Sequence, residues 1–454
     1  MSIKQAFVDG LIFLLKVILV GLDQLLQSAM AAYKALVRSP KQSIPVDKKT
    51  VVIVGGNFSG LAARWKLLQH ADRFRIVVID QKEFFEYTPG VLRLFGEPDH
   101  FSNIAKRIPG DELGPSSFFI QGKVTSIENE QGQKVLTYQH RNETKTLPYD
   151  YLILATGSTY NYPISASSSE FSLGERRTGW EKASQRLGAA SNILILGGGA
   201  VGVELAAEIV DFFPNKQVTL VDASPTLVPL FPIKVGAYAA QWLTNHGVKL
   251  LLGKFLDSWD ERSCKLRDGT VLKADMVYVC FGDRPNSQYA PASAQYNQRR
   301  NIIVEDTLQV SGKGARGDVF ACGDVATPPT EANKQAFHAE VQGQLAAMNV
   351  IRKDGRLRLL TYPDGIAHAS KMPLIFILSL GRYDGVLGLN DLVMSGPITA
   401  VLKWGLEFTK VMQMQGKPMG RIIWSLADEV VLYISRTLIK PNVQSSTVLK
   451  TKTG

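Results

Sequence analysis

The chain has 454 residues, of which 45% are hydrophobic and 20% charged, which excludes a wholly disordered chain and allows two or three folded domains. Its three cysteines, Cys264, Cys280 and Cys322, lie far apart, which excludes a CxxC redox pair and a cysteine-ligated metal site. The net charge of +10 is concentrated in residues 1–49 and 401–454, which favours lipid headgroups over nucleic acid as an anionic partner.

Residues 3–37 are predicted to form one long apolar helix of about 50 Å. Lys16 lies at its centre, which makes insertion across a bilayer only marginal. The polar residues recur about every seven positions, or two helical turns, and so form one narrow stripe: Gln5, Asp9, Lys16, Asp23, Gln27 and Lys34. We therefore interpret residues 1–38 as an amphipathic helix for the membrane interface or for a groove on the protein itself, followed by a polar linker at 39–49.

A glycine-rich turn follows the apolar run "VVIV" and precedes a helix-forming segment. This order is typical of the start of a βαβ unit that binds a dinucleotide, because glycines permit a sharp turn and let the backbone approach a pyrophosphate. The turn contains Gly55, Gly56 and Gly60, with Asn57 where the middle glycine is usual. Asp80 ends the next apolar run, 25 residues after Gly55, where an acidic residue can accept hydrogen bonds from a ribose.

The same pattern recurs in "ILILGGGAVGVELAAEI", with Gly197, Gly199 and Gly202 in the turn and Asp222 25 residues after Gly197. Asp222 would also repel a 2′-phosphate, which favours NADH over NADPH. A single turn of this kind could serve packing alone, and its aspartate could be a solvated strand end. Two copies, each with its own aspartate, favour two dinucleotide sites.

Two further segments each follow an apolar strand: "YDYLILATGS", with Thr156 and Gly157, and "GDVFACGDVA", with Gly323 and Asp324. With these segments the chain resembles the flavoproteins that have two dinucleotide-binding domains. The resemblance implies an α/β fold with two Rossmann-like domains, in which the first turn binds FAD and the second binds NAD(P)H. It implies an FAD domain in two parts, 50–165 and 291–370, divided by an NAD(P)H domain at 166–290.

Within that superfamily, residues 50–410 resemble the ferroptosis-suppressor group, also called apoptosis-inducing-factor-like mitochondrion-associated flavoproteins. The matching segments include "LILATGSTYNYP", "GGGAVGVELAAEI" and "FILSLGRYDGVLG". A lesser resemblance is to the type II NADH dehydrogenases. The first resemblance implies that Arg93 and Val124 contact the flavin, and that Glu204 and Lys410, in "LEFTKVM", lie in the active site. Arg93 could instead be a surface arginine, Glu204 a charge that favours the helix dipole, and Lys410 part of a solvated face.

The C-terminal segment 371–440 is expected to face the membrane. Its stretch "GRIIWSLADEVVLYISRTLI" has an apolar face at helical spacing, which either covers the core or makes a second membrane contact: Ile422, Ile423, Leu426, Ala427, Val430, Val431 and Ile434. Residues 441–454 are expected to be a disordered tail.

The sequence thus indicates an FAD-dependent NAD(P)H:quinone oxidoreductase, located peripherally on a membrane of the mitochondrion or facing the cytoplasm. Its expected partners are a membrane quinone and a lipid surface, and a homodimer is left open. One alternative is a redox-sensing or DNA-binding signalling flavoprotein with low turnover. Another is an oxidoreductase with a soluble electron acceptor.

Overall fold

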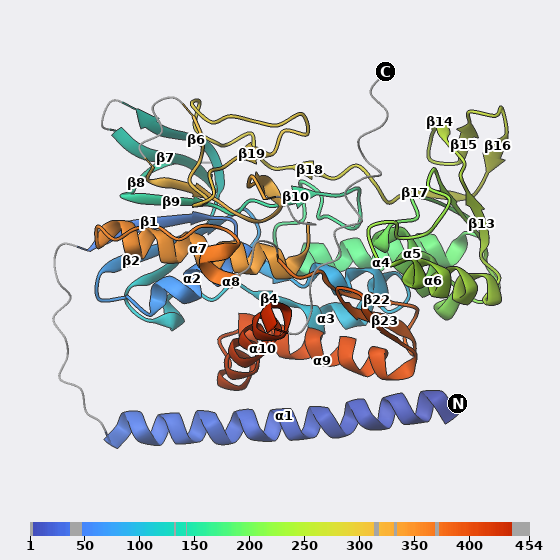
Figure 1. The fold of residues 1–454 in the computed structure, drawn as a ribbon, viewed down its shortest axis with the longest axis horizontal. Helices are drawn as coiled ribbons and strands as arrows, with labels where there is room; N and C mark the ends of the chain where they lie inside the picture. Colours follow the sequence, from blue (N-terminus) through green and yellow to red (C-terminus); the bar gives the residue numbers. More distant parts are fainter. Residues whose placement is uncertain are drawn as a thin grey trace.

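The computed structural model describes residues 3–36, 48–130, 133–141, 143–312, 317–330, 334–367 and 372–437, and two parallel sheets form its centre (Figure 1). The first sheet has the order β20-β9-β1-β2-β5. Its strands are β1 (Lys49–Val54), β2 (Phe74–Asp80), β5 (Ser117–Gln121), β9 (Tyr151–Leu154) and β20 (Val319–Ala321). Four consecutive residues of β1 are buried, as expected for a parallel strand that is covered on both faces.

The second sheet has the order β13-β12-β11-β17, and all its pairings are parallel. Its strands are β11 (Asn192–Leu196), β12 (Gln217–Asp222), β13 (Lys249–Leu252) and β17 (Met276–Val279). All four come between β9 and β20 in the chain, so the second sheet is inserted between two neighbouring strands of the first. This topology agrees with the predicted α/β fold with two Rossmann-like units.

Helices pack on both sheets. On the first sheet, α2 (Phe58–Leu68) lies against α7 (Ala336–Asp354). Their backbones approach so closely that a Cβ atom on Gly343 would lie 2.1 Å from the carbonyl oxygen of Ser59, which explains the glycine. The helices of the second unit are α4 (Leu173–Ala189), α5 (Ala200–Phe212) and α6 (Ile233–Asn245).

Small antiparallel sheets extend from both units. They are β6 (Lys123–Glu130), β7 (Gln133–His140) and β8 (Glu143–Pro148); β14 (Leu256–Trp259), β15 (Ser263–Leu266) and β16 (Val271–Lys273); and β3 (Phe84–Glu86) with β4 (Ala105–Arg107). Two short pairs are β10 (Ser158–Thr159) with antiparallel β18 (Arg284–Pro285), and β19 (Ile302–Ile303) with parallel β21 (Ala326–Thr327). The short helices are η1 (Thr88–Phe95), η2 (Pro98–His100), α3 (Phe101–Ile104), η3 (Asp111–Leu113), η4 (Gly323–Val325) and α8 (Asp364–Ala367).

The C-terminal segment forms a hairpin sheet and two helices. Its elements are β22 (Ile375–Ser379), β23 (Gly385–Leu389), β24 (Leu392–Ser395), α9 (Pro397–Met414) and α10 (Pro418–Thr437). Buried residues of β22 and α9 share one hydrophobic cluster with η1 and α5. The segment therefore covers the second unit on the side where η1 of the first unit also meets it.

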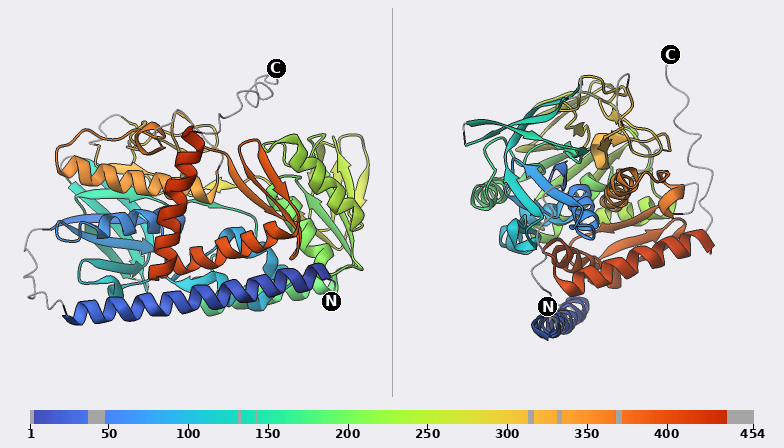
Figure 2. Two further views of the ribbon diagram at one scale, coloured as in Figure 1. Left: turned by 60° about the horizontal axis from the view of Figure 1, so that its bottom comes forward. Right: turned by 90° about the vertical axis from the view of Figure 1, so that its left-hand side faces the viewer.

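The predicted N-terminal helix is present as α1 (Ile3–Leu36), which runs along α9 and the start of α10 (Figures 1 and 2). Within the described ranges, Ile3–Met30 is the one stretch long and apolar enough to cross a membrane. The predicted linker, except for its last two residues, and the tail 441–454 lie outside the described residues. In α10, Ile422, Leu426 and Val430 are exposed, so this part of the predicted apolar face does not cover the core.

A buried ion network ties the first unit to α4. The guanidinium of Arg176 donates to Glu86 at 2.9 Å and to Glu170 at 2.9 Å, and the Trp180 indole N–H donates to Glu86 at 3.1 Å. Arg176 is completely buried. Because both carboxylates are paired, the network can lie in the core without an uncompensated charge.

Candidate functional site

The two glycine-rich turns have nearly the same geometry. Gly55 has φ of +111° and Gly197 has φ of +112°, a region that side chains rarely adopt. A Cβ atom on Gly60 would lie 1.9 Å from the oxygen of Gly55, and one on Gly202 would lie 1.9 Å from the oxygen of Gly197. Each final glycine therefore lets a helix begin directly against the turn, with its N-terminus beside the strand end.

The two aspartates close these turns in the same way. The N–H of Gly56 donates to Asp80 Oδ2 at 2.7 Å, and the N–H of Gly198 donates to Asp222 Oδ2. The other oxygen of each aspartate accepts from a backbone N–H two residues further along the chain. Both aspartates and Gly56 were predicted from the sequence, whereas Gly198, which orients Asp222, was not. Both carboxylates remain only half-buried, at the ends of their strands, where a ribose could reach them.

The residues of the first turn fit a dinucleotide. Asn57 Oδ1 is buried without a hydrogen-bond partner among the described residues, so this turn holds a free acceptor. A Cβ atom on Gly55 would lie 2.2 Å from the oxygen of Ala155, which shows how closely the segment with Thr156 and Gly157 approaches the turn. A dinucleotide needs this kind of small-residue cradle because its pyrophosphate approaches the backbone itself.

The segment with Gly323 and Asp324 completes the same edge of the first sheet. Gly323 has φ of +76°, and a Cβ atom there would lie 2.8 Å from the hydroxyl of Ser59, which belongs to the first turn's helix. The Ser158 hydroxyl lies 3.4 Å from Asp324 Oδ2. The structure thus brings together most of the residues that the sequence assigned to FAD.

Val124 and Arg93 occupy different positions relative to that edge. Val124 is buried in β6, just after Gly122, whose N–H donates to the carbonyl of Asp80 at 2.8 Å. Arg93 lies in η1 and pairs with Glu208 of α5 at 3.4 Å. Arg93 therefore faces the second unit, and no local pattern predicts its pairing with a glutamate 115 positions away.

Glu204 is the centre of a compact hydrogen-bonded group. It lies in the first turns of α5, and its Oε1 accepts from the backbone N–H of Ser379 at 2.7 Å and from the Ser379 hydroxyl at 2.9 Å. The same oxygen accepts from Lys403 Nζ at 2.7 Å, and this nitrogen also contacts the Ser379 hydroxyl. Three elements, α5, β22 and α9, thus converge on one carboxylate oxygen whose side chain is 12% exposed.

Lys403, rather than Lys410, is the lysine that meets Glu204. Lys410 pairs with Glu340 of α7 at 2.7 Å, and its nitrogen lies 3.2 Å from the ring centre of Trp424. Burial is the largest effect on this pair, and it lowers the pKa of Lys410 and raises the pKa of Glu340. The two lysines lie seven residues apart on α9, which is two helical turns. The sequence therefore indicated the correct face of this helix, and only the contact with α5 distinguishes between the two.

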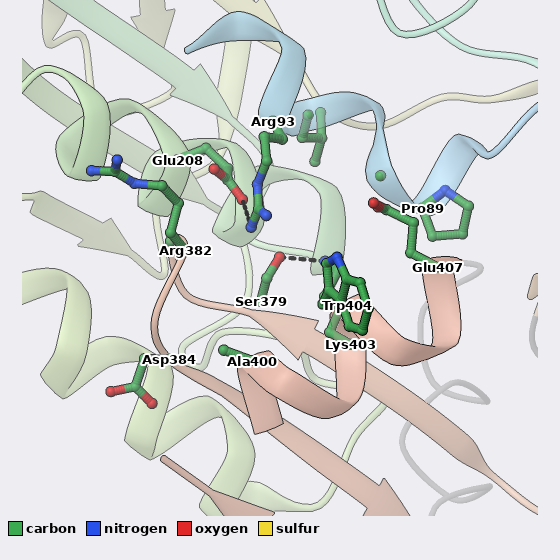
Figure 3. A pocket seen from close by; sticks show the side chains of 13 residues that line it. Pro89, Arg93, Glu208, Ser379, Arg382, Asp384, Ala400, Lys403, Trp404 and Glu407 are labelled. Carbon is green, nitrogen blue, oxygen red and sulfur yellow. Dashed lines mark hydrogen bonds and ion pairs between the residues drawn. The ribbon is translucent and has the colours of Figure 1, made fainter. Parts of the chain in front are cut away.

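A polar cavity adjoins the Glu204 group at the junction of η1, α5, β22 and α9 (Figure 3). Three cationic and three acidic side chains line it: Arg93, Arg382, Lys403, Glu208, Asp384 and Glu407. Glu208 Oε2 has no partner among the described residues, and Glu407 is bonded to His100 at 2.7 Å. Burial acts to raise the pKa of Glu407, but the His100 hydrogen bond and the charges of His100, Arg93 and Lys403 together outweigh it, and the pKa is lowered. The cavity has a volume of about 20 Å³, room for about one water molecule, and the charged groups fixed around it can move protons.

Comparison with known proteins supports this assignment of the fold. Residues 49–343 match the family model described as pyridine nucleotide-disulphide oxidoreductase. Ferroptosis suppressor protein 1 of Xenopus tropicalis is 32% identical over 352 residues, covering 74% of this chain and 87% of the relative. The mouse protein of the same name (Mus musculus) is 30% identical over 364 residues, covering 76% and 89%.

Solved structures show the same architecture. NDH2 from Plasmodium falciparum in complex with NADH has a TM-score of 0.62 at 14% identity, covering 82% of this chain and 100% of that one. The sulfide:quinone oxidoreductase from Aquifex aeolicus has a TM-score of 0.66 at 17% identity, covering 84% and 95%. At these identities the likeness concerns the fold.

Proposed function

Because the chain belongs to the pyridine nucleotide-disulphide oxidoreductase family and is an FAD-dependent NAD(P)H oxidoreductase, we propose that it passes electrons from NADH to a membrane quinone. The observation that carries this proposal is the group formed by Glu204, Ser379 and Lys403 beside the polar cavity. Relatives and structural neighbours include ferroptosis suppressor proteins and a sulfide:quinone oxidoreductase, which agrees with a quinone as acceptor.

The residues assigned to each cofactor follow from the two turns. FAD would be held by the first turn, the Thr156 and Gly157 segment, Gly323 with Asp324, and the strand that contains Val124. NADH would be held by the second turn, with Asp222 on its ribose. Bound FAD supplies the redox chemistry, because it accepts a hydride and releases electrons to the next acceptor.

The side chains of the cavity would manage protons and orientation. Reduction of a quinone to a quinol consumes two protons, and a lysine ammonium can donate one. Glu204 holds Lys403 by a charge-assisted hydrogen bond, and Ser379 fixes both groups through its hydroxyl and its backbone N–H. We assign Lys403 as the proton donor and Glu204 as the group that keeps it charged and oriented.

Arg93 is the link between this cavity and the first unit. Its guanidinium lies in the cavity wall and is held by Glu208, in a helix that begins at the second glycine turn. A positive charge at this position would stabilise electron density that develops on a bound ring. We propose that Arg93 contacts the flavin from this side.

Steady-state oxidation of NADH by the purified protein tests the proposal. The expected result is slow oxidation with oxygen alone and a strong increase on addition of a short-chain quinone that needs no membrane. Unchanged oxidation on addition of the quinone would favour a different acceptor. Negligible turnover together with salt-sensitive DNA binding would favour the signalling alternative.

A further inference from the structure

Helix α1 is joined to the body by specific contacts along one side. Val8 is completely buried and packs in a small cluster with Ala400 and Val401 of α9. Leu11 and Ile12, one turn further along, also pack there. The left-hand view of Figure 2 shows α1 extended along the body over its described length. The helix is thus a docked element.

Three of the four charged residues in Ile3–Met30 take part in this docking. Lys4 pairs with Asp384 at 2.6 Å, and Asp9 lies 3.5 Å from the hydroxyl of Tyr383. Asp23 is 3% exposed, accepts from the backbone N–H of Met419 at 3.1 Å, and lies 3.8 Å from the Lys417 ammonium. The fourth, Lys16, belongs to the same helical stripe as Asp9 and Asp23, at the edge of the docked side.

The opposite side of α1 is apolar and faces away from the protein. Six large apolar side chains are more than half exposed: Ile3, Phe7, Phe13, Leu14, Val17 and Leu25. A helix on the surface of a water-soluble body has the reverse arrangement, with apolar residues inward and charges outward. A continuous exposed apolar face of this length is a site for contact with another apolar phase.

The position of the charges indicates which kind of partner contacts this apolar face. Within Ile3–Met30 the charged residues lie beside the body, with Lys16 exposed at the edge of that side, and the side that faces away carries none, so it offers a protein partner no charge to pair with. A helix that crosses a bilayer would have to leave its docking site and take Lys16 and Asp23 into the hydrocarbon. A helix lying in the interface keeps both charges in polar surroundings and immerses the apolar side.

We propose that α1 is an in-plane membrane anchor, with its outer face in the acyl layer and its docked side fixing the body against the bilayer surface. The inference rests on the proposed function, because it assumes a membrane partner. Asp384 both binds Lys4 and lines the polar cavity, and Ala400 both packs on Val8 and lines it. The anchor thus holds the cavity next to the lipid, where a quinone is dissolved.

The depth of three positions in vesicles tests this proposal. Phe7, Leu14 and Leu25 lie on one row of the outer face, and Phe7 and Leu25 are about 27 Å apart along the helix. Each would be replaced singly by cysteine in the full-length holoenzyme and labelled with an environment-sensitive probe. After binding to vesicles of phosphatidylcholine and phosphatidylserine, depth-dependent quenchers should report one shallow depth for all three. The chain without an added cysteine measures the background from the native cysteines, of which Cys264 and Cys322 are buried and Cys280 is partly buried.

Different depths for the three positions, with Leu14 deepest, would show that the helix spans the bilayer and would overturn the proposal. Equal exposure of all three probes to water would overturn it as well. These readouts do not depend on turnover. A protein that binds vesicles as expected but fails to reduce a soluble quinone would refute the proposed function and leave the anchor intact.

A matched pair of substitutions provides a second test. Val17 in α1 is 55% exposed and Val271 in strand β16 is 53% exposed, so Glu at either site places no charge in the core of the folded protein. Val17→Glu should lower the vesicle-bound fraction about tenfold or more at limiting lipid, because a charge replaces an apolar side chain that is immersed in the acyl layer when the protein is bound. Val271→Glu should leave it unchanged. Equal binding of both variants would contradict the anchor.

Discussion

At the scale of single residues, the two lysines of α9 have different expected roles. Lys403 is expected to act in proton transfer and Lys410 in packing. Lys403→Met should reduce kcat for quinone reduction about a hundredfold, because the proton donor is removed. Glu204→Gln should give a loss of similar size, since the lysine loses its charged partner. Steady-state kinetics with NADH and a short-chain quinone measures both. Full activity in both variants would exclude this group from the reaction.

Lys410→Met is the matched control from the same helix. It leaves Glu340 buried without its partner, so the free energy of unfolding should fall by about 3 to 5 kcal/mol. The kcat of the remaining folded enzyme should stay within about threefold of the original, because Lys410 contacts Trp424 and Glu340 rather than Glu204. Chemical denaturation and kinetics together provide the comparison. A large loss of kcat with unchanged stability would return the catalytic assignment to Lys410.

We expect Asp222 to determine the choice between the two nicotinamide cofactors. Its carboxylate lies at the end of β12 and is oriented by the N–H of Gly198, so a 2′-phosphate would meet a fixed negative charge. Asp222→Ala should raise the kcat/KM ratio for NADPH relative to NADH by about tenfold or more. The two cofactors would be compared at equal quinone concentration. An unchanged ratio would mean that groups other than Asp222 distinguish NADH from NADPH.

These residues also show which parts of the site can be predicted from the sequence and which cannot. In each copy of the turn, the aspartate lies 25 residues after the first glycine. The placement of the aspartate beside the turn can therefore be predicted from local spacing. Lys403 is 199 positions from Glu204 and Ser379 is 175, so no local pattern indicates that they meet. Lys16 and Asp23 belonged to one predicted stripe, but only the docked helix shows that Asp23 is buried.

At the scale of elements, the network around Arg176 fixes α4 to the strand that carries Glu86. Arg176→Met should lower the free energy of unfolding by about 3 to 5 kcal/mol, because two buried carboxylates lose their partner. Arg177→Met is the matched control, since the neighbouring side chain is 49% exposed and its ion pairs are at the surface. Its effect should be below about 1 kcal/mol. Equal effects, measured by denaturant unfolding, would contradict the importance of the buried network.

The contact between Glu407 of α9 and His100 of η2 should make stability depend on pH. The pKa of Glu407 is lowered in the folded state, so folding favours its carboxylate form. The stabilisation is therefore present above the pKa of the unfolded glutamate, about 4.3, and is lost as the pH falls through the lower folded value. In Glu407→Gln, the free energy of unfolding should fall less steeply as the pH decreases below about 4.3. An unchanged pH profile would show that the His100 contact contributes nothing.

At the scale of the whole molecule, the two sheets, the C-terminal hairpin and α1 form one arrangement around the cavity. The two glycine turns lie at the ends of separate sheets, and η1 and α9 close the space beside α5. Helix α1 covers the outer side of α9 and presents an apolar surface (Figure 1). A donor dissolved in water and an acceptor dissolved in lipid could thus reach one protein from different phases.

An anaerobic absorbance titration of the purified holoenzyme tests the central claim most directly. The account predicts a flavin spectrum that is bleached by NADH and restored in full by a short-chain quinone, without oxygen. Restoration should be slowed in Lys403→Met while bleaching by NADH is preserved. A preparation that binds no flavin, or one that NADH bleaches and quinone does not restore, would contradict it.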